Sequence, residues 1–175
     1  INLAISIAQA DQRVLLIDCD LRKPKMHHYF GVSNAPGLTN YISDSVKNNG
    51  PKTDLYSIIH RTEFSNLSLL CAGSIPPNPA ELLMNERFDQ LIDELKKRYD
   101  YIILDNVPAL VVADAAIVSR VTDLTIYVIR DGVLDRRYLP ELERLHQDGK
   151  FKNMCIVLND SQVEKKKYGY GQGYG

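Results

Sequence analysis

Five short apolar runs, rich in Val, Ile and Leu, constrain the fold of this 175-residue chain more than any other feature. They are apolar nearly throughout rather than alternating, and strands that are buried on both faces of a parallel sheet have this pattern. The expected strands cover residues 14–18, 67–72, 101–105, 124–130 and 154–159. The sequence therefore predicts a mostly parallel sheet.

Helical stretches lie between most of these runs. The clearest covers residues 79–98, where apolar residues recur at helical spacing. Asn78 can cap its start, Pro79 suits the first helical position, and Glu81 can reach back to the cap. Further helices are expected over 1–10, 113–121 and 135–147, and short helices and loops over 31–66. Strands that alternate with helices predict an α/β fold with helices flanking the sheet.

Composition and charge narrow the class of protein. The chain is 45% apolar and 25% charged, as soluble domains are, and its formal net charge of -1 gives no reason to expect a nucleic-acid partner. No apolar stretch is long enough to cross a bilayer, so we expect a soluble chain. The cysteines lie in apolar runs without metal-type spacing, which predicts buried thiols at Cys19, Cys71 and Cys155.

The C-terminal segment alternates glycine with tyrosine and other polar residues. Ordering such a segment costs backbone entropy and buries little surface, so we expect one domain over 1–163 and a flexible tyrosine-rich tail over 164–175. A tyrosine beside a glycine is accessible, which suits a kinase substrate. The alternative is a low-complexity adhesive tail.

Two acidic residues follow the first apolar run, Asp18 at its end and Asp20 two positions later. Carboxylates at the carboxyl end of a parallel strand face the crevice in which such sheets bind ligands. Two acids there can hold a hydrated Mg²⁺, and one can accept a proton from an attacking hydroxyl. Arg22 and Lys23 follow and can neutralise phosphate charge. The alternative is a surface loop whose aspartates cap the next element.

Another apolar run ends in Asp105. This pattern is typical of a Walker B strand, whose acid holds a Mg²⁺-bound water. A simple strand-end turn is the alternative, because Asp, Asn and Pro are ordinary turn formers. Both acidic motifs are expected at the same edge of one sheet, and together they indicate a site for Mg²⁺ and a nucleotide.

In these motifs the chain resembles the bacterial tyrosine kinases, a family within the MinD/ParA-like group of P-loop ATPases. Residues 14–24 resemble the family's extra Walker motif, an apolar strand followed by Asp-x-Asp-x-Arg. Residues 73–83 resemble its Gly-x-x-Pro-Pro-Asn-Pro-x-Glu-Leu-Leu segment, and the tail resembles its autophosphorylation cluster. The resemblance implies a P-loop NTPase fold that uses ATP and Mg²⁺.

The resemblance also implies roles for single residues. Asp18 and Asp20 would bind metal and activate the tyrosine hydroxyl, in a division left open, and Asp105 would hold the Mg²⁺ shell. The acceptors, phosphorylated by a neighbouring subunit, would be Tyr168, Tyr170 and Tyr174.

Weaker correspondences concern residues near the nucleotide. Arg130 and Asn159 end strands near the position at which the wider group holds adenine, and Arg22 would contact the nucleotide's phosphates. Asp114 matches an Asp-Ala pair of the family, with a helix cap as the alternative. In place of the family's Asp-x-Pro-Pro, the chain has Asp-Asn-Val-Pro from Asp105.

No Gly-x-x-x-x-Gly-Lys-Ser/Thr motif occurs in the chain. In the family a helix resembling Ile1-Asn-Leu-Ala begins a few residues after that motif. We therefore expect this chain to lack the N-terminal Walker A segment and the strand before it, and to bind ATP poorly by itself.

The family's function implies an autokinase that phosphorylates its own tail in trans and regulates capsule or exopolysaccharide synthesis and export. It implies the cytoplasmic face of the bacterial inner membrane, a homo-oligomer such as a ring, a membrane-anchored region or adaptor, and a cognate tyrosine phosphatase. The alternatives are a MinD/ParA-like positioning ATPase, which the tyrosine tail disfavours, and a degenerate scaffold, which the retained aspartates disfavour.

Overall fold

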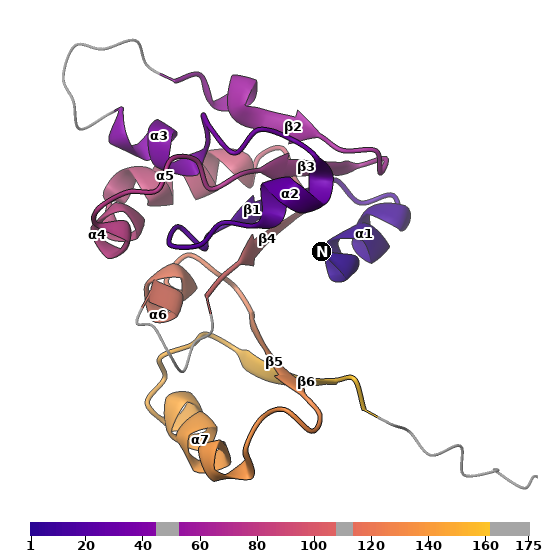
Figure 1. Ribbon diagram of the computed structural model, residues 1–175, viewed down its shortest axis with the longest axis vertical. Coiled ribbons are helices and arrows are strands. Elements are labelled where there is room, and N and C mark those ends of the chain that lie inside the picture. The colour runs from indigo at the N-terminus through magenta and orange to yellow at the C-terminus, as the bar shows by residue number, and fades with distance from the viewer. Residues whose placement is uncertain (45–52, 108–113, 162–175) are drawn as a thin grey trace, which may run out of the picture. The chain divides into compact units, whose positions relative to one another are not determined.

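The computed structural model describes residues 1–44, 53–107 and 114–161 (Figure 1). The chain divides into two compact units, Ile1–Thr122 and Asp123–Gly175. The single domain expected over 1–163 stays a prediction, and the tail over 164–175 lies outside the described residues.

The first unit is built on a four-stranded sheet in the order β2-β3-β1-β4. Its strands are β1 (Val14–Asp18), β2 (Ile59–Arg61), β3 (Leu67–Leu70) and β4 (Tyr101–Asp105). The central strand β1 pairs in parallel with β3 and β4, and the short β2 pairs antiparallel with β3. The predicted mostly parallel sheet is therefore confirmed for this unit.

Helices cover both faces of this sheet, and alternate residues of β1 face opposite layers, as the pleat of a strand requires. Leu15 packs in the same cluster as Phe88, whereas Leu16 packs in the cluster that contains Ala4. The helices are α1 (Asn2–Gln9), α2 (Met26–Phe30), α3 (Leu38–Ser43), the 3-10 helix η1 (Leu55–Ile58), α4 (Pro79–Met84), α5 (Glu86–Leu95) and α6 (Asp114–Ser119). The predicted α/β fold is confirmed.

The single helix expected over 79–98 is wrong. The segment forms two helices, α4 and α5, because Asn85 leaves the helical conformation and its side-chain oxygen accepts the Arg87 N–H at 2.9 Å. Asn78 does occupy the N-cap position of α4, but its side chain donates to the Glu81 carboxylate instead of accepting a backbone N–H.

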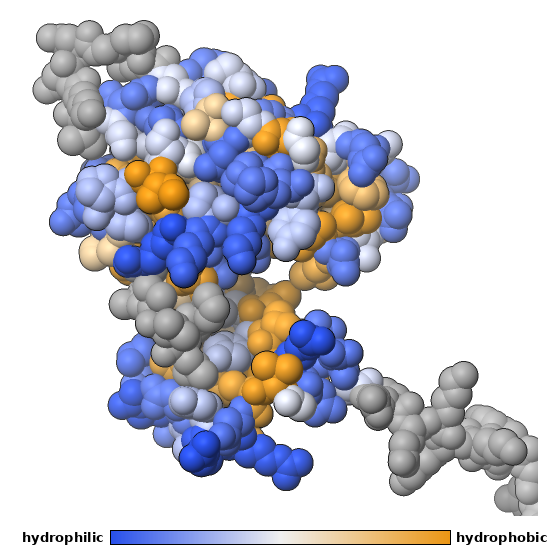
Figure 2. All heavy atoms as spheres, in the orientation of Figure 1, coloured by the Kyte–Doolittle hydropathy of each residue, from blue (hydrophilic) through white to orange (hydrophobic). Residues whose placement is uncertain are grey.

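The second unit contains a two-stranded parallel sheet, a 3-10 helix and a helix. These are β5 (Thr125–Arg130), η2 (Arg136–Tyr138), α7 (Leu139–Gln147) and β6 (Met154–Asn159). Its strands are not buried on both faces as expected, since Ile126, Val128, Ile156 and Leu158 are exposed, and apolar residues are visible on the surface of this unit in Figure 2. Within the described part of the unit only two strands pair, so much of the sheet surface stays open.

Among the described residues, no helix combines the length and the apolar character needed to cross a bilayer.

Candidate active site

Two of the three predicted acids meet at the carboxyl edge of the four-stranded sheet. Asp18 is the last residue of β1 and Asp105 the last residue of β4, and they are partners in the parallel register. The Cys19 N–H extends the pairing by donating to the Asp105 carbonyl oxygen at 2.8 Å. The expectation that both acids lie at the same edge of one sheet is confirmed.

The Asp18 carboxylate organises the loop that follows β1. The residue is only 2% exposed, and its Oδ1 and Oδ2 atoms accept the N–H groups of Asp20 and Met26 at 3.1 and 3.2 Å. The Asp20 Oδ1 atom in turn accepts the N–H groups of Arg22 and Lys23 at 3.2 and 3.0 Å. Most of these bonds lie within the loop, and only the bond from Met26, the first residue of α2, matches the alternative in which the aspartates cap the next element. Together they hold the carboxylates at the sheet edge.

Burial and mutual repulsion disfavour negative charge on these acids. The pKa of Asp18 is raised, mainly by burial; the N–H groups of Met26 and Asp20 counteract this, and the charges of Asp105 and Asp20 add to it. The pKa of Asp105 is also raised, first by loss of hydration although the residue is exposed, and the Asp20 charge adds to the shift. A bound cation would offset these costs.

The donor set fits a magnesium–nucleotide complex. Mg²⁺ in such sites binds one or two carboxylates and keeps waters and phosphate oxygens as its other ligands. The helix α1 begins at Asn2, and the positive end of a helix suits phosphate charge. Within residues 1–44, 53–107 and 114–161, no three His, Cys, Asp or Glu side chains form a metal site by themselves. The metal roles of Asp18, Asp20 and Asp105 stay predictions.

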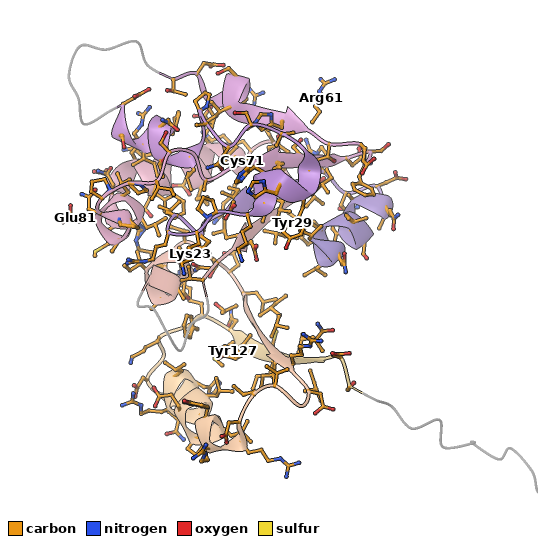
Figure 3. All side chains as sticks on the ribbon, viewed as in Figure 1. Lys23, Tyr29, Arg61, Cys71, Glu81 and Tyr127 are labelled. Atoms are coloured by element: carbon orange, nitrogen blue, oxygen red, sulfur yellow. The ribbon has the colours of Figure 1, made fainter. Side chains whose placement is uncertain are left out.

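The remaining predicted site residues fall in different parts of the chain. Arg22 and Lys23 are exposed in the loop after β1, where Figure 3 labels Lys23. Arg130 and Asn159 are register partners in the second unit, and the Arg130 guanidinium pairs with Asp160 at 2.8 Å. The backbone of α6 begins at Asp114. The predicted acceptors Tyr168, Tyr170 and Tyr174 lie outside the described residues.

The cysteines near the acids are not activated thiols. Burial raises the pKa of Cys71 to about 11, with the Asp18 charge adding to the shift. Burial also raises the pKa of Cys19, assisted by Asp18 and Asp105. The prediction of buried thiols holds for these two, but it is wrong for Cys155, which is exposed on β6 because the described sheet there has only two strands.

Sequence reasoning missed a set of hydrogen bonds between residues 37–40 and residues 71–74, which we call the clasp. The clasp holds the segment after β3, and β3 ends at the same edge of the sheet as β1 and β4. The Leu38 N–H donates to the Cys71 carbonyl at 2.9 Å, and the Thr39 hydroxyl donates to the Ser74 carbonyl at 2.7 Å. The Asn40 Oδ1 atom accepts the Ser74 N–H at 3.2 Å. These bonds fix the start of the 73–83 segment beside the carboxylates' end of the sheet.

Glycine makes this close approach feasible. A Cβ atom on Gly37 would lie 2.5 Å from the Cys71 carbonyl oxygen and 2.6 Å from the Gly73 nitrogen. Gly73 has a positive φ of 90°, and a Cβ there would lie 2.6 Å from polar side-chain atoms of Thr39 and Asn40. The glycines were the available signal, but their partners are distant in the sequence and no local pattern links them.

Comparisons with known proteins identify the class. Residues 1–130 match the AAA domain family. The tyrosine-protein kinase CpsD of Streptococcus agalactiae is 36% identical over 176 residues, which is 99% of this chain and 73% of CpsD. The tyrosine-protein kinase Wzc of Salmonella typhi is 38% identical, but the match, 99% of this chain, is 23% of Wzc. The chain thus spans about a quarter of the length of the Wzc proteins it matches.

Comparison with solved structures gives the same class of protein. The kinase domain of the Escherichia coli tyrosine kinase ETK superposes with a TM-score of 0.77 at 35% identity, covering 98% of this chain and 64% of that one. MinD of Pyrococcus horikoshii, determined with Mg-ADP, superposes with a TM-score of 0.67 at 19% identity over 92% of this chain and 64% of MinD, which shows the shared P-loop ATPase fold alone. This chain belongs to the AAA-domain family and, within it, to the bacterial tyrosine-protein kinases.

Proposed function

We propose that the protein is an ATP-dependent tyrosine kinase whose catalytic edge is the carboxyl end of β1 and β4. The observation that carries this proposal is the register pairing of Asp18 with Asp105, with Asp20 fixed in the adjoining loop, in a chain similar over nearly its whole length to tyrosine-protein kinases. The raised pKa values of Asp18 and Asp105 support a role in holding a cation.

In this proposal the side chains have separate tasks. Asp18, buried and engaged on both oxygens, orients the loop, and Asp105 would hold the metal's water shell. Asp20, only half-buried, accepts the tyrosine proton as the tyrosine oxygen bonds to the γ-phosphorus of ATP and ADP leaves. Mg²⁺, when bound, neutralises phosphate charge. Arg22, Arg130 and Asn159 are proposed nucleotide contacts.

The finer proposal concerns the substrate and its setting. The acceptors are Tyr168, Tyr170 and Tyr174 of a neighbouring copy, so the protein acts in trans within a homo-oligomer, and a ring of subunits is the proposed form. Several phosphates on one tail would each add roughly -1.5 to -2 charges and repel neighbouring copies. By its family, the protein would regulate capsule or exopolysaccharide export at the cytoplasmic face of the inner membrane. A membrane-anchored region or adaptor would attach it, a phosphatase would reverse the reaction, and no nucleic acid would be involved.

Phosphopeptide mapping tests this function. The protein, expressed with whatever its gene encodes upstream of Ile1, is incubated with Mg·ATP and its phosphotyrosines are mapped by mass spectrometry. Phosphate on the tail tyrosines that disappears in Asp20→Asn supports the proposal. Mixing Asp20→Asn with a variant whose three tail tyrosines are Phe tests transfer in trans, since only the inactive copy then carries acceptors. ATP hydrolysis with an unmodified tail would instead favour a positioning ATPase, and neither activity would favour a scaffold.

A further inference from the structure

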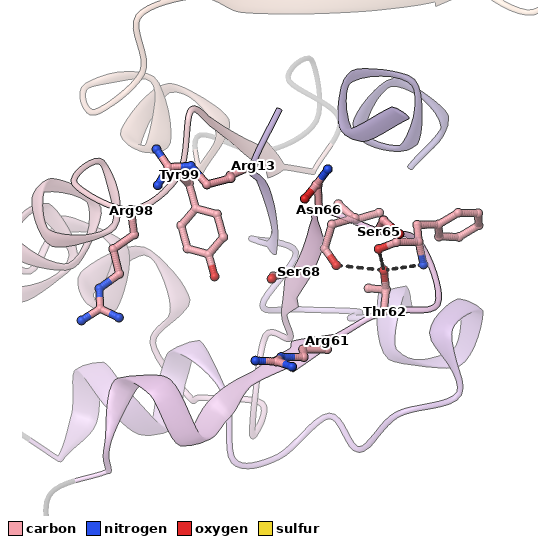
Figure 4. A pocket seen from close by; sticks show the side chains of 10 residues that line it. Arg13, Arg61, Thr62, Ser65, Asn66, Ser68, Arg98 and Tyr99 are labelled. Atoms are coloured by element: carbon pink, nitrogen blue, oxygen red, sulfur yellow. Dashed lines mark hydrogen bonds between the residues drawn. The ribbon is translucent and has the colours of Figure 1, made fainter. Parts of the chain in front are cut away.

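A cavity lies at the edge of the four-stranded sheet opposite the Asp18 edge. It has a volume of about 430 Å³ and is lined by Arg13 before β1, by residues 61, 62 and 64–68 of the β2–β3 hairpin, and by Arg98 and Tyr99 after α5 (Figure 4). Arg13 precedes β1 and Leu67 begins β3, so this cavity lies at the amino ends of the parallel strands. Since a strand rises about 3.3 Å per residue, the length of β1 separates it from the Asp18 edge.

Three arginines line this cavity, which we call the arginine pocket (Arg13, Arg61, Arg98). Arg13 is already neutralised, because its Nη2 and Nε atoms donate to the Asp100 carboxylate at 2.7 and 3.0 Å. Arg61 and Arg98 form no ion pair with any residue in the described ranges. The pocket therefore holds two guanidinium groups whose charge is not balanced by a direct carboxylate partner.

The surroundings of these arginines are held in place. Arg61 is the register partner of Ser68 across β2 and β3, so the two side chains lie on the same face of the hairpin. Arg98 lies over the Tyr56 ring at 3.9 Å, and the Tyr56 hydroxyl donates to Glu94 at 2.7 Å. The Glu94 carboxylate, four positions before Arg98, is thus engaged by Tyr56.

The hairpin itself is closed by its own hydrogen bonds, because the Thr62 hydroxyl donates to the carbonyl oxygens of Leu67 and Phe64 at 2.9 and 3.2 Å. The hydroxyls of Ser68 and Tyr99 also line the pocket and bond to no other residue within the described part of the chain. Figure 4 shows the Tyr99 and Ser68 hydroxyls and the Arg61 guanidinium directed toward a common space. Guanidinium N–H groups with adjacent hydroxyl donors are the groups that bind a phosphate monoester dianion.

The rest of the lining selects among phosphate monoesters. The ring of Tyr99 and the side chain of Phe64 supply apolar wall, and about 430 Å³ lies in the range of pockets that enclose a small organic group. A ligand that joins an aromatic ring to a phosphate dianion uses both kinds of lining. We propose that the arginine pocket binds a phosphotyrosine side chain, presented by the phosphorylated tail of another copy of this chain. The inference rests on the proposed kinase function for its source of phosphotyrosine.

Binding is measured by fluorescence anisotropy with the full chain, treated beforehand with a phosphatase. The probes are synthetic peptides of residues 164–175 with phosphotyrosine at 170, with phosphoserine at 170, or unmodified, and inorganic phosphate serves as competitor. Arg61→Gln and Arg98→Gln each remove one guanidinium. Lys97→Gln removes the same charge one position from Arg98, outside the pocket lining, and is the matched control.

The phosphotyrosine peptide is expected to bind, and each arginine variant to weaken it about tenfold or more, as loss of one charge-assisted pair does. Lys97→Gln is expected to stay within about twofold. Equal affinity for the unmodified or phosphoserine peptide, competition by free phosphate as strong as by the peptide, or unchanged affinity in folded Arg61→Gln and Arg98→Gln would overturn the proposal. The peptides are phosphorylated by synthesis, so the binding experiment does not depend on kinase activity. If the protein binds them but transfers no phosphate, the proposed kinase function is contradicted and the proposed binding site is supported.

Discussion

Asp18 and Asp105 are register partners at the ends of two adjacent parallel strands, and the charge of Asp105 adds to burial in raising the pKa of Asp18. The fold thus brings two carboxylates together. Among the described residues, neither carboxylate forms an ion pair with a basic side chain. An arrangement of this kind costs stability without a cation and favours binding of one.

The raised pKa of Asp18 predicts a pH dependence of stability. The folded state holds the proton more tightly than the unfolded state, whose pKa is near the ordinary value of 3.8. Stability is therefore lost as the pH rises from about 3.8 through the folded-state pKa. Urea unfolding from pH 4 to pH 7 without Mg²⁺ should show a steeper decline in the free energy of unfolding for the wild type than for Asp18→Asn. Identical slopes would contradict the assignment.

The lowered pKa of Asp100 predicts a pH dependence of stability opposite to that of Asp18. Its hydrogen bonds to the Arg13 side chain and backbone N–H lower its pKa to about 2. The stabilisation is complete above about 3.8 and is lost as the pH falls through about 2. Asp100→Asn should lower the Tm at pH 7, and the difference from the wild type should shrink toward pH 2. The pair is exposed, so added salt should reduce the difference. A difference that persists unchanged at pH 2 would rule out the ion pair as its source.

The strands of the site could be predicted because their signals are local. An apolar run that ends in an acid specifies β1 and β4 independently of the rest of the chain, and parallel pairing then brings Asp18 and Asp105 to one edge. The same reasoning missed β2, because Ile59, His60 and Arg61 carry no strand pattern and pair only through their long-range register with β3.

The structure differs from the sequence-based prediction at two further places, one for a local reason and one for a long-range reason. Periodicity extended one helix through Asn85, where a capping hydrogen bond to the Arg87 N–H starts a new helix and outweighs the apolar pattern. The clasp between Gly37 and Gly73 joins segments more than thirty positions apart, and a glycine in a sequence does not reveal which backbone approaches it.

The clasp predicts a large cost for one added methyl group. Gly37→Ala places a Cβ against backbone atoms of Cys71 and Gly73, which have no room to move, so we expect a loss of about 2 kcal/mol or more in the free energy of unfolding. Gly31→Ala is the comparison variant, because Gly31 has a positive φ of 63°, unlike the extended Gly37, but no heavy atom within 4 Å of its added Cβ. That change should cost only about 1 kcal/mol. Equal losses measured by urea unfolding would argue against the clasp.

The most direct test of the carboxylate site is the initial rate of phosphotyrosine formation with Mg·ATP, in the protein expressed with whatever its gene encodes upstream of Ile1. Asp105→Asn removes the charge at the end of β4, and Asp93→Asn removes the same charge from an exposed position on α5. We predict that Asp105→Asn lowers the rate about 100-fold or more, as loss of one catalytic electrostatic contact does, while Asp93→Asn stays within about twofold of the wild type. Equal rates for Asp105→Asn and the wild type would contradict the assignment of this sheet edge as the catalytic site.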